Sequence, residues 1–267
     1  NAGTLTLSSD ADGYSQLKVD GTVTNTGTIS QSQYLNNDGY TSMSSPMTAD
    51  FATTSGDYTK MFYYDGSAFA WRTTNEAGRG YFATIGSSGF STSAGNFSVT
   101  GTPNTSLSHT LSYVANTATG GSGTGWNLVG NPYTCALDWT AMTKTDVNNA
   151  YYVWDPDTEL YKYYASGAQS GTYLSASNTL NGIIPPMQAF WVQTTSSSAT
   201  LSSTMADDGT LDNSSTYISK TVPDNLIVGV VALNDSSQND ALWLIENMQA
   251  KTGFDGEFDA YKMENGT

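Results

Sequence analysis

Short segments in which apolar residues alternate with Thr or Ser recur along this chain, and they restrict its fold more than any other feature. Examples are residues 5–7, 17–19, 22–24 and 97–99. A period of two places one side of a strand in a core and the other side in solvent. Turn-forming Asp-Gly and Gly-Gly pairs separate the segments, as antiparallel strands require. The pattern predicts an all-β fold, an antiparallel sandwich or barrel, and we expect a jelly-roll-like β-sandwich.

Helix signals are weak by comparison. Ser, Thr, Gly, Asn and Tyr are frequent throughout the sequence, and all of them are poorer helix formers than Ala or Leu. No amphipathic stretch is long enough to form a stable helix. The best candidate is a short turn over residues 136–143, with Asp138 or Thr140 as its cap.

The sequence also contains an internal repeat, because three segments of the first half match three of the second half in the same order. The pairs are Gly39–Met47 with Gly125–Tyr133, Met61–Gly66 with Tyr151–Pro156, and Gly80–Ala83 with Ala189–Val192. The repeat predicts that residues 36–202 form one β-sandwich from two related units, 36–110 and 120–202, which share an aromatic core. The alternative is that Gly-aromatic and Asp-Gly pairs recur by chance in a Gly-rich β protein.

The remaining segments differ in composition from the repeat. Residues 1–35 alternate but hold few aromatic residues, which predicts a strip of edge strands. Residues 203–215 are polar, acidic and rich in turn formers, so we expect a linker there. Residues 216–267 contain the apolar runs 226–233 and 241–245 and are expected to begin a second β domain.

Charge and cysteine content exclude several classes of partner and site. The chain has 24 acidic and 9 basic residues and a formal charge of −15, so it cannot present the basic surface that nucleic acid or anionic lipid requires. It has no apolar run long enough to insert into a membrane. Cys135 is the single cysteine, which rules out an internal disulfide and a thiolate zinc cluster.

Catalytic residues are sparse as well. His109 is the only histidine, and it lies in plain alternation, as an ordinary strand residue would. Cys135 has no neighbouring cation in the sequence to activate it, so we expect a buried or bystander thiol. A pair of acids could hydrolyse glycosides, but Asp155, Asp157 and Glu159 lie where a hairpin turn is expected. We therefore expect no enzyme activity.

Two kinds of binding site remain possible, an aromatic site for a ligand and an acidic site for a metal. Trp154, Tyr161 and Tyr163 are candidates for stacking on a ligand such as a glycan, with Tyr161 and Tyr163 on one face of a strand and Tyr164 on the other. The alternative is that these rings are core and ordinary β-surface residues.

Calcium is the candidate metal. Asp255, Glu257 and Asp259 form the densest acidic cluster, similar to the opening of an EF-hand loop, although Ala260 stands where that loop has Gly. The other Ca²⁺ candidate is an acidic group in the expected linker, namely Asp207, Asp208 and Asp212. The alternative is that both are solvated acidic loops that bind no metal.

Several segments resemble large surface proteins of Bacteroidetes that the type IX secretion system exports. The matching segments are Gly125–Tyr133, Tyr151–Asp155, Ile183–Val192, Asn239–Trp243, Ala250–Asp255 and Asp259–Met263. The resemblance implies an adhesin-like module of a multidomain protein, located outside the cell or on the cell surface, with other modules, other surface proteins and the secretion machinery as partners. The function expected from these observations is non-catalytic contact, in adhesion, surface motility or an extracellular assembly. The alternative is a carbohydrate-binding module attached to an extracellular enzyme.

Overall fold

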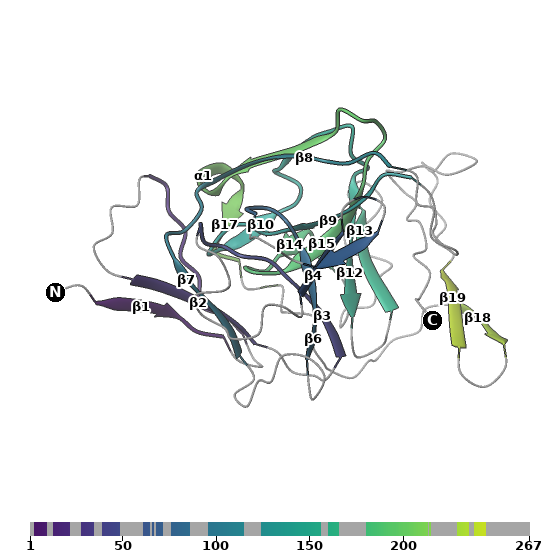
Figure 1. The fold of residues 1–267 in the computed structure, drawn as a ribbon, viewed down its shortest axis with the longest axis horizontal. Coiled ribbons are helices and arrows are strands. Elements are labelled where there is room, and N and C mark those ends of the chain that lie inside the picture. Colours follow the sequence, from purple (N-terminus) through teal and green to yellow (C-terminus); the bar gives the residue numbers. More distant parts are fainter. Residues whose placement is uncertain are drawn as a thin grey trace.

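A computed structural model shows that the chain is built almost entirely of β-strands, mostly in antiparallel pairs, with one short helix among the described residues (Figure 1). The all-β, sandwich-like fold expected from the alternation is confirmed. The structure describes residues 3–9, 13–21, 28–34, 39–48, 61–64, 66, 68–71, 76–85, 96–114, 124–155, 160–165, 180–212, 214, 229–234 and 238–243.

Two four-stranded sheets form the centre of the molecule. The first has the order β3 (Gly39–Met43), β6 (Tyr81–Ile85), β4 (Met61–Tyr64), β5 (Phe69–Trp71). The second has the order β9 (Trp126–Gly130), β15 (Ala189–Gln193), β12 (Ala150–Asp155), β13 (Leu160–Ala165). In chain order both sheets place their first, fourth, second and third strands side by side, so they have one topology.

The pairing of residues across the strands repeats as well. The equivalent pairs are Tyr40–Thr84 with Trp126–Gln193, Phe62–Phe82 with Tyr152–Trp191, and Tyr64–Phe69 with Trp154–Tyr161. The first two are the pairs that the sequence matches predict, because the matches align residues 40, 62 and 82 with 126, 152 and 191. The third pair shows that the repeat continues beyond the matched segments. Register depends on side-chain pattern, since a slip of one residue reverses the faces of a strand. The sequence repeat is therefore a repeat of structure.

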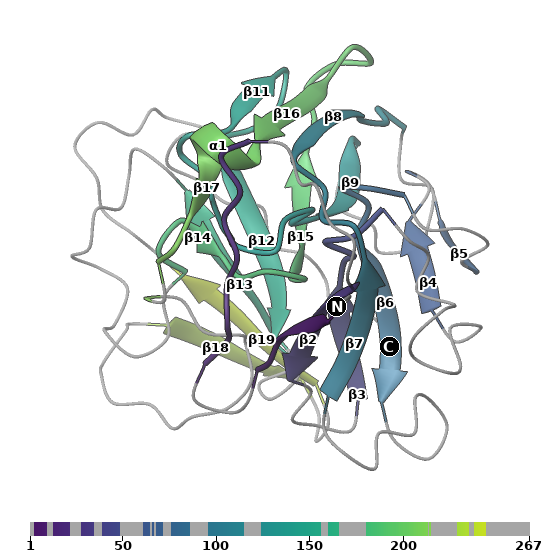
Figure 2. The same cartoon turned by 90° about the vertical axis from the view of Figure 1, so that its left-hand side faces the viewer.

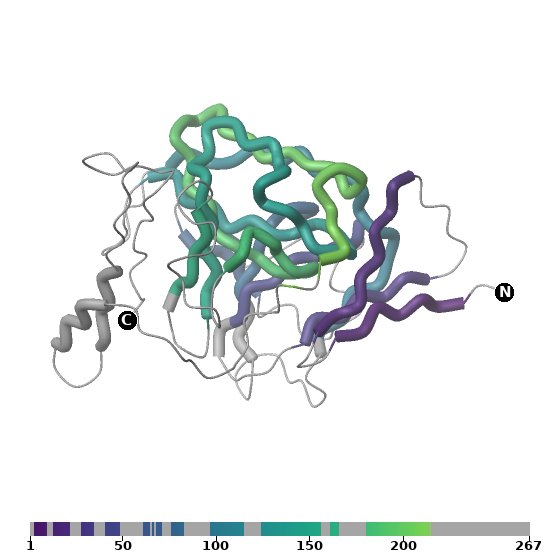
Figure 3. The backbone as a smooth tube through the Cα atoms, turned by 180° about the vertical axis from the view of Figure 1, so that it is seen from behind, coloured from purple at the N-terminus to yellow at the C-terminus, as the bar shows by residue number. Residues whose placement is uncertain are grey.

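The repeat extends beyond the two central sheets. Before β3 lies β2 (Thr28–Tyr34), which pairs antiparallel with β7 (Asn96–Gly101). Before β9 lies β8 (Ser106–Thr110), which pairs in the same way with β16 (Thr200–Thr204), and Figure 3 shows these two segments side by side. The first unit is therefore β2–β7 and the second β8–β16. The expected boundary at 110 differs, because β8 pairs with a strand of the second unit.

Three apolar clusters separate the sheets into layers. The two central sheets meet at one cluster, which includes Phe82 from the first and Trp126, Tyr152 and Trp191 from the second. The other face of the first sheet packs against the sheet β1–β2–β7, where β1 is Thr4–Leu7. The other face of the second sheet is covered by β8, β16 and a set of short strands: β10 (Ala136–Asp138), β11 (Thr143–Thr145), β14 (Ile183–Ile184) and β17 (Gly209–Thr210).

The N-terminal region forms more than a strip of edge strands. β1 is the outer strand of its sheet, but it pairs parallel to β2. Parallel neighbours need a crossover connection, and residues 13–21 of this crossover run past α1 on the second unit (Figure 2). The N-terminal residues therefore link the two units.

Residues 203–210 also differ from the linker expected over 203–215. They complete β16, form the helix α1 (Met205–Asp208) and begin β17. Met205 is fully buried in the outer core of the second unit, which fixes the segment although its neighbours are polar.

The remaining expectations for secondary structure concern the possible helix over residues 136–143 and the C-terminal segment. Residues 136–143 hold β10 and a turn rather than a helix, and the Asp138 carboxylate accepts a hydrogen bond from the Thr140 N–H at 2.8 Å. At the C-terminal end, β18 (Gly229–Asn234) and β19 (Gln238–Trp243) pair as an antiparallel hairpin.

Candidate functional site

The central aromatic cluster includes several rings that remain partly exposed. Trp191 in β15 lies in edge-to-face contact with Tyr64 at 5.0 Å and with Phe69 at 6.0 Å between ring centroids. Phe69 is 53% exposed although it touches three other rings. Such contacts hold an aromatic surface rigidly, because each ring restricts the rotation of its neighbour.

The predicted binding residues belong to the same cluster. Trp154 and Tyr161 are half-buried and lie opposite each other on β12 and β13, with ring centroids 5.1 Å apart. Half-buried Tyr163 packs beside Tyr152 at 6.1 Å. Tyr164 instead packs against the outer core of the second unit, so the predicted division of these residues between two faces is confirmed.

We name Phe69, Trp154, Tyr161 and Tyr163 the aromatic seam. The seam combines the two interpretations that the sequence left open, since each ring packs on the core and keeps part of its surface in solvent. Phe69 was not predicted as a site residue. The structural repeat reveals it, because the pairing of Phe69 with Tyr64 is equivalent to that of Tyr161 with Trp154.

The polar groups of the seam suit contacts rather than proton transfer. The indole N–H of Trp154 is buried and has no hydrogen-bond acceptor among the residues that the structure describes. Burial raises the pKa of Tyr161, so its hydroxyl stays protonated. On the opposite face of the same hairpin, Asp155 forms an ion pair of 2.6 Å with Lys162. The arrangement can stack on a flat or apolar surface and can donate hydrogen bonds.

His109 lies in β8, half-buried and opposite Leu201. Burial lowers its pKa, and the positive charge of Arg79 adds to the effect. Arg79 itself forms an ion pair with Glu76 at 2.7 Å and lies over the ring of Tyr63. His109 is therefore a neutral strand residue beside an ion pair.

The thiol of Cys135 is fully buried, as expected. Burial raises its pKa to about 12, so the thiolate that reacts with electrophiles is scarce at neutral pH. In the folded state Cys135 is a packing residue.

The expected calcium ligands fall in two regions. Asp255, Glu257 and Asp259 lie outside the described residues. Asp207 accepts a hydrogen bond from the Thr204 hydroxyl and Asp208 one from the Thr204 N–H, while Asp212 accepts one from the Ser214 N–H. Within the described part of the chain, no three acidic, His or Cys residues are grouped as a metal site would need.

Comparison of the chain with protein-family models, with curated proteins and with solved structures gave no match. None of the helical residues that the structure describes forms a segment long and apolar enough to cross a bilayer.

Proposed function

We propose that this chain is a non-catalytic contact module of a larger bacterial surface or secreted protein, with a role in adhesion or extracellular assembly. The observation that supports the proposal is the aromatic seam, in which rings from both units are held against the core with part of their surface exposed. Tyr and Trp carry much of the energy in protein interfaces because they bury a large area with few rotatable bonds.

The composition supports the same role. Only 12% of the residues are charged, whereas Ser and Thr are abundant. A hydroxyl-rich surface can hydrogen-bond to a partner without the desolvation cost that buried charges carry. Contact through the seam is therefore expected to depend weakly on salt.

The test is adhesion of the purified chain to surfaces coated with extracellular-matrix proteins or with a second layer of the same chain, measured by quartz-crystal microbalance. We expect Tyr161→Ala and Phe69→Ala each to weaken retention at least tenfold. The matched control is Tyr113→Ala, which removes a ring that is 45% exposed outside the seam. Equal retention of all variants would contradict the proposal.

Carbohydrate binding is a second candidate, favoured by the partly exposed rings of Trp154, Tyr161 and Tyr163, which lie together. Aromatic faces stack on the apolar faces of sugars. On a glycan array we expect Trp154→Phe, which keeps the ring surface and removes the N–H, to weaken binding less than Trp154→Ala. A folded chain that binds no glycan would exclude this candidate.

A further inference from the structure

Residues 13–20, here named the N-terminal clasp, connect β1 to β2 by crossing onto the second unit. Both strands that they join belong to the outer sheet of the first unit. The clasp itself bonds to residues 134–136, just before and within β10, and to Met205 in α1. One segment thus holds together two layers that lie on opposite sides of the central sheets.

Hydrogen bonds attach the clasp to the segment that leads into β10. The Leu17 N–H donates to the Thr134 carbonyl at 2.9 Å, and the Thr134 hydroxyl donates to the Leu17 carbonyl at 2.6 Å. One residue further on, the Ala136 N–H donates to Oε1 of Gln16 at 2.6 Å. These three bonds align the clasp with residues 134–136.

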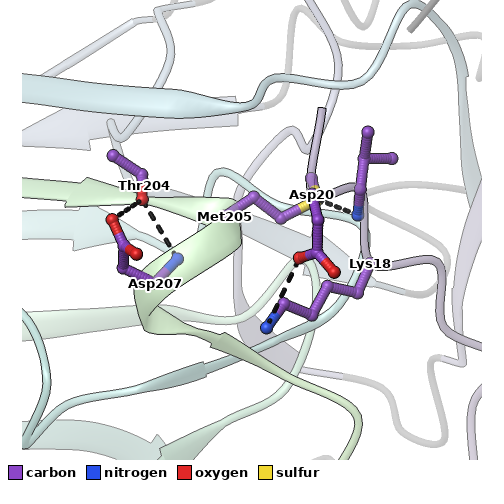
Figure 4. A network of polar contacts seen from close by, with 6 residues as sticks. Lys18, Asp20, Thr204, Met205 and Asp207 are labelled. Atoms are coloured by element: carbon purple, nitrogen blue, oxygen red, sulfur yellow. Dashed lines mark hydrogen bonds and ion pairs between the residues drawn. The ribbon is translucent and has the colours of Figure 1, made fainter. Parts of the chain in front are cut away.

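The C-terminal end of the clasp, residues 18–20, is held by weaker contacts, which are drawn in Figure 4. The Val19 N–H donates to Sδ of Met205 at 3.0 Å, and a thioether is a weak acceptor. Lys18 and Asp20 form an ion pair of 3.6 Å within the clasp, and Asp20 is 74% exposed. Exposed pairs of this kind contribute little to stability.

Tyr14, at the start of the clasp, is buried, and the other two apolar side chains are divided between two cores. Leu17 packs against the outer core of the first unit, and Val19 packs against that of the second. Both side chains are only partly buried. Residues 15–20 of the clasp contain no fully buried side chain, and such a segment opens at a lower free energy than the strands around it.

Cys135 lies between Thr134 and Ala136, the two residues that bind the clasp. Its thiol is fully buried, and the charges of Lys18 and Asp20 are close enough to act on it. Val19 packs against the same apolar cluster that contains Cys135 and Met205. Detachment of the clasp therefore uncovers one side of this cluster.

We propose that the N-terminal clasp opens and closes on the second unit while both β units stay folded, and that Cys135 becomes accessible to solvent in the open state. The clasp is a two-state element: closed, it ties the outer layers of the molecule together. Open, it frees the backbone groups of residues 134–136 and the side of α1.

The test is the rate at which 5,5′-dithiobis(2-nitrobenzoate) modifies Cys135 in the whole chain. In the unmutated protein we expect slow modification whose rate changes little at low urea concentration, because clasp opening exposes little surface. Modification through global unfolding would instead rise steeply with urea. A steep rise from the lowest urea concentration would overturn the proposal without any variant.

Two variants weaken the clasp from opposite sides. Gln16→Ala removes the acceptor for the Ala136 N–H, and Thr134→Val removes the hydroxyl donor to Leu17. Each is expected to speed modification about fivefold, the effect of one lost hydrogen bond. The matched control Thr110→Val alters an exposed residue of β8 and is expected to leave the rate unchanged. Clasp variants that react at the rate of the control would also overturn the proposal.

Discussion

The two units of the molecule share a backbone arrangement but differ in the side chains at equivalent positions. At their junction the contacts are reciprocal: the Ser44 N–H donates to the Met187 carbonyl at 2.8 Å, and the Gly130 N–H donates to the Gly78 carbonyl at 2.9 Å. The sequence matches make Ser44 equivalent to Gly130 and Gly78 equivalent to Met187. The junction therefore has an approximate two-fold symmetry that depends on main-chain groups, which leaves the side chains free to differ.

The turns that precede β6 and β15 show how far the side chains differ. Gly78 and Met187 both have a positive φ, of 76° and 63°. A Cβ on Gly78 would lie 2.4 Å from Cδ1 of Leu107, so a side chain here would require Leu107 to move. Met187 accepts an unfavourable backbone conformation, and its side chain is fully buried in the outer core of the first unit. Equivalent backbones thus serve different packing needs.

The largest difference between the units is expected at Asn131 and its equivalent Ser45. The two hydrogens on Nδ2 of Asn131 are shared among the carbonyls of Cys135, Ile184 and Pro185, and Oδ1 accepts from the Tyr133 N–H. The Ser45 hydroxyl accepts from the Met47 N–H, as Asn131 does from Tyr133, and donates to the Met47 carbonyl. We expect Asn131→Ala to lower the free energy of unfolding by about 4 kcal/mol and Ser45→Ala by about 1 kcal/mol. Urea unfolding measures both, and equal losses would show that Asn131 stabilises the second unit no more than Ser45 stabilises the first.

A charged pair distinguishes the second hairpin from the first. Lys162 pairs with the buried Asp155, whereas the equivalent of Lys162 in the first unit is Ala70. Lys162→Ala is expected to cost about 3 kcal/mol, because it removes this cation from a carboxylate that is 2% exposed. Thermal unfolding of Lys162→Ala and of Lys162→Met, which keeps the aliphatic stem, separates charge from packing. If Lys162→Met is as stable as the unmutated chain, the ion pair does not contribute.

Substitutions in the two turns are expected to have smaller effects on stability. At Met187 the cause is the loss of a side chain, and at Gly78 it is the addition of one. Met187→Gly relieves the backbone strain but removes a buried side chain, and we expect a net loss of about 2 kcal/mol. Gly78→Ala introduces both strain and the close contact with Leu107, and about 2 kcal/mol is again expected. In Gly78→Ala combined with Leu107→Ala, the contact is absent and only strain remains. If the stability loss of the double variant equals the sum of the two single losses, the contact between residues 78 and 107 costs nothing.

The two units also differ in how alkaline pH affects them, because Tyr133 of the second unit is equivalent to Met47 of the first. Both residues are fully buried, but only Tyr133 titrates. Burial raises the pKa of Tyr133 above its ordinary value near 10, so above that pH the unfolded chain releases a proton that the folded chain retains. Stability is therefore lost as pH rises. Tyr133→Phe is expected to reduce this loss by about 1 kcal/mol in urea titrations between pH 10 and 11. Tyr113→Phe, at an exposed ring, is the control.

Much of the fold was accessible from the sequence because its signals are local. Alternation in Phe97–Val99 and the split between Tyr161 and Tyr164 depend only on the period of a strand, and both agree with the structure. The candidate seam was predicted in part, since Trp154, Tyr161 and Tyr163 lie together in the structure. Phe69 was missed because its exposure depends on how the two sheets meet.

The chain by itself determined the strands, the internal repeat and the register within each unit, since these follow from the pattern of apolar side chains along a strand. The tertiary structure decided what crosses between units: the pairing of β8 with β16, the burial of Met205 in an acidic segment, and the path of the clasp over residues 134–136. These features join residues far apart in the chain, and a polar segment shows no sign in its own composition of the core that it will cover.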